Sequence, residues 1–144
     1  MRFNRRGIVA VDTLGNTPNA DILCRNVSGA IFAHIQLKTF IRGNRTVLVG
    51  RIAEIDFGRA FFLVLASIPS PTTESDFTYF IIASKEMEKN VCEAHLKWLS
   101  QPGRKGTVRS DSKVRTGTLP TEASNAPWDL MKYRNNCGLN SDLL

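Results

Sequence analysis

The chain has 144 residues, of which 42% are hydrophobic, and 19 Lys and Arg against 13 Asp and Glu give it a net charge of +6. This length and composition are typical of one globular domain, and no apolar run is long enough for a membrane span or placed as a signal peptide would be. We therefore expect a cytoplasmic protein without a membrane partner, and the excess positive charge favours polyanions.

Short apolar segments separated by turn residues predict a series of strands. The expected strands are 7–11, 20–24, 30–39, 45–50, 60–68 and 77–83. The run 60–68 is continuously apolar and is followed by Pro69 and Pro71, a pattern typical of a central strand buried on both faces. Together with a helix after the last strand, these segments predict an α/β fold.

The expected helix begins near Ser84, whose hydroxyl can cap it, with Glu86 and Glu88 near its positive end. Apolar residues at helical spacing predict a face that packs on the sheet. They are Met87, Val91, Ala94, Trp98 and Leu99. Pro102 and Gly103 end the helix.

The segment 101–116 carries five basic side chains and one acid, Asp111. The basic residues are Arg104, Lys105, Arg109, Lys113 and Arg115. Pro102, Gly103 and Gly106, together with the lack of an apolar period, predict a mobile basic loop. Two interpretations are open from these residues alone: an arm that binds phosphate groups, or a solvated linker.

We expect residues 1–116 to form one domain that includes this loop. The tail 117–144 is rich in Thr, Ser, Asn and Pro and is expected to be irregular. Its one apolar cluster predicts a short helix near 127–133, which would dock Trp128 on this domain or on a second copy of the chain.

A row of polar side chains lies on one face of the third expected strand. Alternate residues of a strand share a face, so His34, Gln36 and Lys38 point one way and apolar residues the other. A buried amide or ammonium is costly unless it has a partner. Asp21 heads the preceding strand, and the turn 27–29 would fold that strand back antiparallel, so the carboxylate can supply the partner.

An acid, a second oxygen ligand and a lysine two residues later match the needs of metal-assisted phosphodiester hydrolysis. Oxygen ligands suit Mg²⁺ or Mn²⁺. An ammonium can orient the attacking water and balance charge on the phosphate. Asp21, Gln36 and Lys38 are therefore the candidate catalytic residues.

These residues resemble the PD-(D/E)xK nuclease superfamily, in particular a branch in which the last motif reads Gln-x-Lys. The matching segments are 19–23, 34–39, 61–65, 80–84 and 95–106. The resemblance implies a restriction endonuclease-like fold, with a mixed central sheet flanked by helices, and a metal-dependent endonuclease that hydrolyses DNA. It further implies that Asp21 and Gln36 bind the metal and that Lys38 is the catalytic lysine, and it favours the phosphate-binding arm.

Two departures from the superfamily bear on activity. Its usual helix before the first strand is expected to be missing or truncated, because residues 1–6 lead almost directly into 7–11. Gln36 offers a neutral oxygen, which binds Mg²⁺ more weakly than a carboxylate does. Asp12 is a candidate for an additional acid, and His34 for a phosphate contact, although each is also explained as an ordinary structural residue.

The alternative hypothesis is a catalytically inactive member that binds nucleic acid or serves as a structural or assembly subunit. The missing helix and the neutral Gln36 favour it. A homodimer would suit an enzyme that cuts both strands of a duplex, and the cluster near Trp128 is the candidate contact.

Overall fold

The computed structural model describes residues 8–13, 18–69, 77–119 and 130–135. Its strands are β1 (Val9–Asp12), β2 (Ile22–Arg25), β3 (Ile31–Ile41), β4 (Thr46–Leu48), β5 (Phe61–Ile68), β6 (Tyr79–Ala83) and β7 (Thr116–Thr118). Its helices are α1 (Ser84–Ser100) and the 3-10 helices η2 (Arg51–Glu54), η3 (Arg104–Gly106) and η4 (Leu130–Tyr133). Within these residues, no helix has the length and apolar character to cross a membrane.

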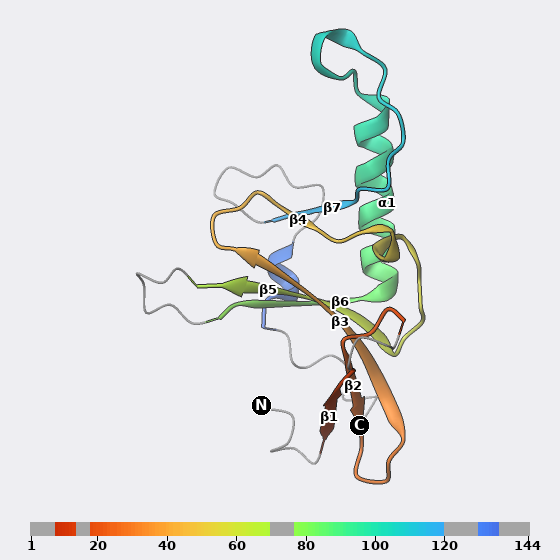
Figure 1. Cartoon of the computed structure of the whole chain (residues 1–144), viewed down its shortest axis with the longest axis vertical. Helices are drawn as coiled ribbons and strands as arrows, with labels where there is room; N and C mark the ends of the chain where they lie inside the picture. Colours follow the sequence, from red (N-terminus) through yellow and green to blue (C-terminus); the bar gives the residue numbers. More distant parts are fainter. Residues whose placement is uncertain (1–7, 14–17, 70–76, 120–129, 136–144) are drawn as a thin grey trace.

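A mixed five-stranded sheet in the order β1-β2-β3-β5-β6 forms the centre of the molecule (Figure 1). β1, β2 and β3 pair antiparallel, β3 and β5 parallel, and β5 and β6 antiparallel. This confirms the α/β class and the mixed sheet. In the described part of the chain one α-helix, α1, lies beside the sheet, where flanking helices were expected.

Side chains of the sheet alternate between two cores. On the α1 side, Leu63 and Leu65 of β5 and Ile82 of β6 pack with Met87 and Val91 of the helix. The core on the other face consists of Ile8, Cys24, Ala33, Ile35, Phe62 and Val64. Leu65 and Ile82 are fully buried, and such burial stabilises the fold by about 1.5–3 kcal/mol per side chain. β5 is therefore buried on both faces, as its apolar run predicts.

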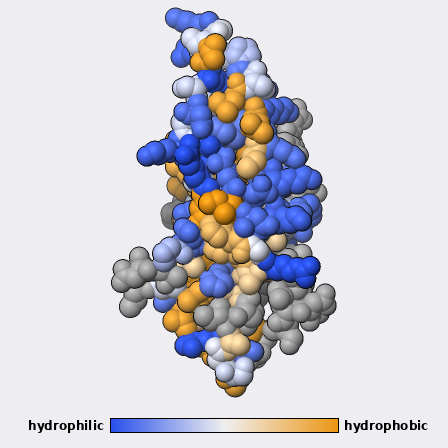
Figure 2. All heavy atoms as spheres, turned by 90° about the vertical axis from the view of Figure 1, so that its right-hand side faces the viewer, coloured by the Kyte–Doolittle hydropathy of each residue, from blue (hydrophilic) through white to orange (hydrophobic). Residues whose placement is uncertain are grey.

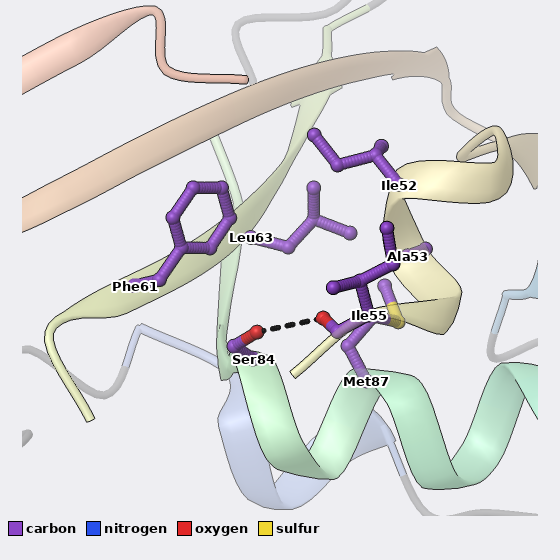
Figure 3. A pocket seen from close by; sticks show the side chains of 7 residues that line it. All are labelled: Ile52, Ala53, Ile55, Phe61, Leu63, Ser84 and Met87. Atoms are coloured by element: carbon purple, nitrogen blue, oxygen red, sulfur yellow. Dashed lines mark hydrogen bonds between the residues drawn. The ribbon is translucent and has the colours of Figure 1, made fainter. Parts of the chain in front are cut away.

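The start of α1 differs from the expectation that Ser84 caps it. The N-cap residue is Ala83, and it makes no side-chain capping bond. The Ser84 hydroxyl instead donates to the Ile55 carbonyl at 3.0 Å (Figure 3). It also accepts a hydrogen bond from the Phe57 N–H at 2.8 Å. The capping prediction is wrong because this hydroxyl fixes the loop after η2.

Only the first half of α1 packs as its apolar stripe predicts. Met87 and Val91 are buried, but Trp98 is 43% exposed. The reason is visible in Figure 1, where the C-terminal half of α1 extends past the sheet.

Two described parts of the tail, 117–119 and 130–135, pack on the domain, where an irregular segment was expected. β7 pairs antiparallel with β4, and Leu119 is buried beside them. η4 places Leu130 and Tyr133 in the core on the α1 side, so a short helix does dock there. Trp128 lies outside the described residues.

Candidate functional site

Asp21 and Gln36 are in direct contact. Gln36 Nε2 donates a hydrogen bond of 2.7 Å to Asp21 Oδ2, and the Leu37 N–H donates another of 2.7 Å to the same oxygen. Gln36 is buried and Asp21 is exposed. A surface carboxylate therefore satisfies a buried amide, and the strand pairing brings the two together as the sequence predicts.

Asp21 is held because it continues the pairing of β2 with β3. Its N–H donates to the Ile35 carbonyl at 2.8 Å, and its carbonyl accepts from the Thr13 N–H at 2.9 Å. β2 begins at the next residue, Ile22, opposite Ile35. Where the backbone pairing stops, the Asp21 carboxylate accepts the next N–H of β3, that of Leu37. Asp21 therefore has a structural role in ending this ladder.

Lys38 lies on the same face of β3 as Gln36. In the parallel pairing with β5, Gln36 lies opposite Leu63 and Lys38 opposite Leu65, and both leucines belong to the core on the α1 side. Lys38 is partly buried. The polar row therefore faces the α1 side of the sheet, with the lysine beside apolar neighbours.

The two accessory candidates, His34 and Asp12, lie on opposite faces of the sheet. The His34 ring stacks beside Phe61, with centroids 6.5 Å apart, on the same face as Gln36. Asp12 pairs with Ile22, which packs against the core on the other face, and directly paired residues share a face. The register thus places Asp12 on the opposite side of the sheet from Gln36.

The Asp21–Gln36 pair offers a metal one carboxylate and one amide oxygen. In the described segments, no three His, Cys, Asp or Glu side chains gather as a metal site. Mg²⁺ is often held by one or two carboxylates, with waters and substrate phosphates as the other ligands. The pair fits a weakly held ion, on the condition that the Gln36 amide turns so that Oε1 replaces the Nε2 that now faces Asp21.

A small apolar cavity of about 10 Å³ lies next to this row, beside Leu63 (Figure 3). It is lined by Ile52, Ala53, Ile55, Phe61, Leu63, Ser84 and Met87. One water molecule needs about 10–15 Å³. The cavity is therefore a packing gap, and any substrate of the Asp21 site would bind at the surface.

The basic segment 101–116 is anchored to the molecule, which corrects the expectation of a mobile loop. Arg109 donates to the Trp98 carbonyl at 2.9 Å, and its guanidinium lies 4.7 Å from the centre of the Trp98 ring. Arg115 is only 5% exposed and pairs with Glu54 and Asp111. In this position the Arg115 guanidinium is occupied by two carboxylates, whereas the sequence predicts it on the nucleic-acid surface.

Sequence reasoning missed the role of Asp111, whose carboxylate pairs with Arg51 and Arg115 at 3.2 Å each. The available signal was its place as the one acid in a basic segment. The position of Asp111 does not predict its partners, because Arg51 lies 60 residues earlier in the chain.

Arg104, Lys105 and Lys113 remain exposed. η3, which contains the first two, follows the end of α1 that points away from the sheet (Figure 1). Figure 2 shows this side of the molecule, where hydrophilic side chains cover most of the upper half. The arm therefore offers cations to solvent at a distance from the Asp21–Gln36 pair.

Comparison of the chain with models of protein families, with curated proteins and with solved structures finds no match.

Proposed function

We propose that this protein is a metal-dependent nuclease that hydrolyses DNA phosphodiester bonds at Asp21, Gln36 and Lys38. The observation that carries the proposal is the 2.7 Å contact between the Asp21 carboxylate and the Gln36 side chain, with Lys38 on the same face of β3. A restriction endonuclease-like fold belongs to the same proposal, and the mixed sheet supports it.

Asp21 would supply the charged oxygen ligand and Gln36 a neutral one. A bound Mg²⁺ or Mn²⁺ would polarise the phosphate and lower the pKa of the attacking water. Lys38 contributes its ammonium, which attracts the phosphate and balances the negative charge that develops on it. Because Lys38 is partly buried beside Leu65, this attraction is less screened by water than at an exposed lysine.

The basic arm would engage the DNA away from the reaction. α1 has 17 residues, which corresponds to about 25 Å at 1.5 Å per residue. That length equals roughly seven base pairs of duplex at 3.4 Å each. Arg104 and Lys105 would therefore hold the backbone of a duplex and orient it, while Asp21 and Lys38 meet the scissile phosphate.

One observation favours the alternative, a catalytically inactive protein that binds nucleic acid. Gln36 presents its N–H group to Asp21, so the pair is satisfied without a metal. Such a protein would bind DNA in a salt-sensitive way through the arm, and Asp21→Asn would leave binding unchanged.

Nicking of supercoiled plasmid with Mg²⁺ or Mn²⁺ tests the proposal. Asp21→Ala and Lys38→Ala should each lose at least a hundredfold in rate, since each removes a group that acts on the reacting phosphate. Lys85→Ala, which changes an exposed lysine of α1, should retain full activity. Folding of each variant is matched by circular dichroism and thermal unfolding.

Equal nicking by all four proteins would identify a contaminant and reject the proposal. A folded wild type that nicks neither plasmid nor single-stranded or branched DNA would reject it as well. In that case, salt-sensitive binding that weakens in Arg104→Ala and Lys105→Ala would establish the alternative.

A further inference from the structure

A second cavity, of about 150 Å³, lies past the other end of the polar row of β3. Phe40, two residues after Lys38 on the same strand, forms part of its wall, and Phe80 of β6 lies beside it with ring centroids 6.2 Å apart. Arg42 and Arg134 also line it. The cavity thus combines an aromatic wall with two cationic side chains.

The two arginines come from distant parts of the chain. Arg42 follows β3 directly, and Arg134 follows η4, which the bridge between Phe80 and Arg134 holds against β6. Within the described residues, neither guanidinium has a carboxylate partner, and no Asp or Glu lines the cavity. Two like charges lining one cavity repel each other, so an anion between them would be stabilised.

Ser67 adds a neutral hydrogen-bonding group. It lies opposite Phe40 in the β3–β5 pairing, lines the cavity and is only 6% exposed. Its N–H is bonded to the Thr78 carbonyl at 2.8 Å, but among the residues that the structure describes its hydroxyl has no hydrogen-bond partner. Among the described residues no buried polar side-chain atom lacks a partner, so this hydroxyl is accessible from the cavity and can bond to a ligand there.

We propose that this cavity binds a phosphate group through Arg42, Arg134 and Ser67. Guanidinium groups bind phosphate by paired, charge-assisted hydrogen bonds, and a serine hydroxyl can donate a further one. The volume is about ten times that needed for one water but below the roughly 300 Å³ of pockets that enclose a whole organic ligand. The cavity therefore takes the phosphate, and the rest of the ligand lies outside.

The phosphate can be free or can end a nucleic-acid strand. The aromatic wall of Phe40 and Phe80 favours a phosphate whose attached group also packs on a ring. The cavity is separate from the Asp21–Gln36 pair, so binding should need no metal and should not depend on the nuclease proposal.

Isothermal titration calorimetry in EDTA tests the site with three probes: inorganic phosphate, a 5′-phosphorylated oligonucleotide and the same oligonucleotide with a 5′-hydroxyl. Arg42→Gln and Arg134→Gln should each weaken phosphate binding at least tenfold. Arg45→Gln is the matched control, since Arg45 is exposed in the same loop but does not line the cavity. Ser67→Ala should weaken binding severalfold.

Tighter binding of the phosphorylated oligonucleotide than of its 5′-hydroxyl form, lost in Arg42→Gln but kept in Arg45→Gln, would identify a strand end as the ligand. Equal binding of the two oligonucleotides, with phosphate binding that depends on Arg42 and Arg134, would identify free phosphate. No phosphate binding by the folded wild type, or equal loss in Arg45→Gln, would overturn the proposal.

Discussion

His95 Nε2 lies 2.9 Å from Asp111 Oδ1, and this contact ties the basic arm to α1. The same carboxylate also pairs with Arg51 of η2 and with Arg115, the residue before β7. One exposed acid thus connects the arm to α1 and to η2. The arm keeps its place beside the projecting half of α1 through this acid and through the contact of Arg109 with Trp98.

Asp111→Asn should release the arm from α1. The variant loses the charge that attracts Arg51 and Arg115, although its amide oxygen can still accept a hydrogen bond. We expect limited trypsin digestion after Arg104 or Lys105 to become several times faster, because local opening exposes the backbone to the protease. Lys113→Gln, which changes an exposed neighbour, should be cut at the wild-type rate, and equal rates for all three proteins would contradict the anchoring role.

Acid should weaken the same contacts. The hydrogen bond from His95, and then the charges of Arg115 and Arg51, lower the pKa of Asp111 below its ordinary value of 3.8. Because the pKa is lower in the folded state, the stabilising contribution is complete above that ordinary value and is lost as the pH falls through the lowered one. Thermal unfolding measured between about pH 2 and 6 should show the wild type losing more stability on acidification than Asp111→Asn does.

The buried pair of Arg115 and Glu54 should matter more for stability. The side chains are 4% and 22% exposed, and removing one partner of a buried ion pair typically costs about 3 kcal/mol. Arg115→Met should therefore lower the free energy of unfolding by roughly that amount in urea titration. Arg51→Met should cost less than about 1 kcal/mol, because the Arg51 side chain is 53% exposed.

A combined Arg115→Met and Glu54→Leu variant separates the charge from the packing. It should be more stable than the sum of the two single changes predicts, because neither charge is left unpaired. Additive losses would show that the pair stabilises the fold only through its apolar contacts.

Metal binding at Asp21 can be detected without an activity assay. A ligand that binds only the folded state raises the melting temperature, and at a hundred times its Kd it adds about 2.7 kcal/mol. Mn²⁺ should raise the melting temperature of the wild type and leave that of Asp21→Asn unchanged. Asp12→Asn is the matched control, since Asp12 lies on the other face of the sheet, and a shift lost in this variant instead would place the ion elsewhere.

The sequence predicted the centre of the fold because the evidence for it is local. The apolar run of β5 and the alternation in β3 depend on neighbouring residues, and a short turn brings Asp21 to Gln36. The contact does not by itself establish catalysis, since the Asp21 carboxylate also ends the pairing of β2 with β3 by accepting the Leu37 N–H.

The parts that sequence reasoning missed depend on distant partners. Ser84 lies in the sequence where a helix cap is expected, but its hydroxyl bonds to Ile55 and Phe57 in the loop before β5. Arg115 lies in a basic segment typical of phosphate binding, but it pairs with Glu54, which lies 61 residues earlier in the chain. No local pattern reports either partner.

The pairing of β4 with β7 joins Thr46 to Thr118, so a long loop must close before this small sheet can form. Two strands of three residues each are too short to offset the entropy of closing this loop. The β4–β7 pair therefore depends on packing against the central sheet, which Val47 of β4 provides. All five strands of the central sheet have been synthesised once β6 is complete. Leu119 and η4 come later in the chain and complete the core on the α1 side of that sheet. The order of the chain thus allows the central sheet to form before its core is fully covered. The β4–β7 pairing is non-local, and pairings of this kind slow folding.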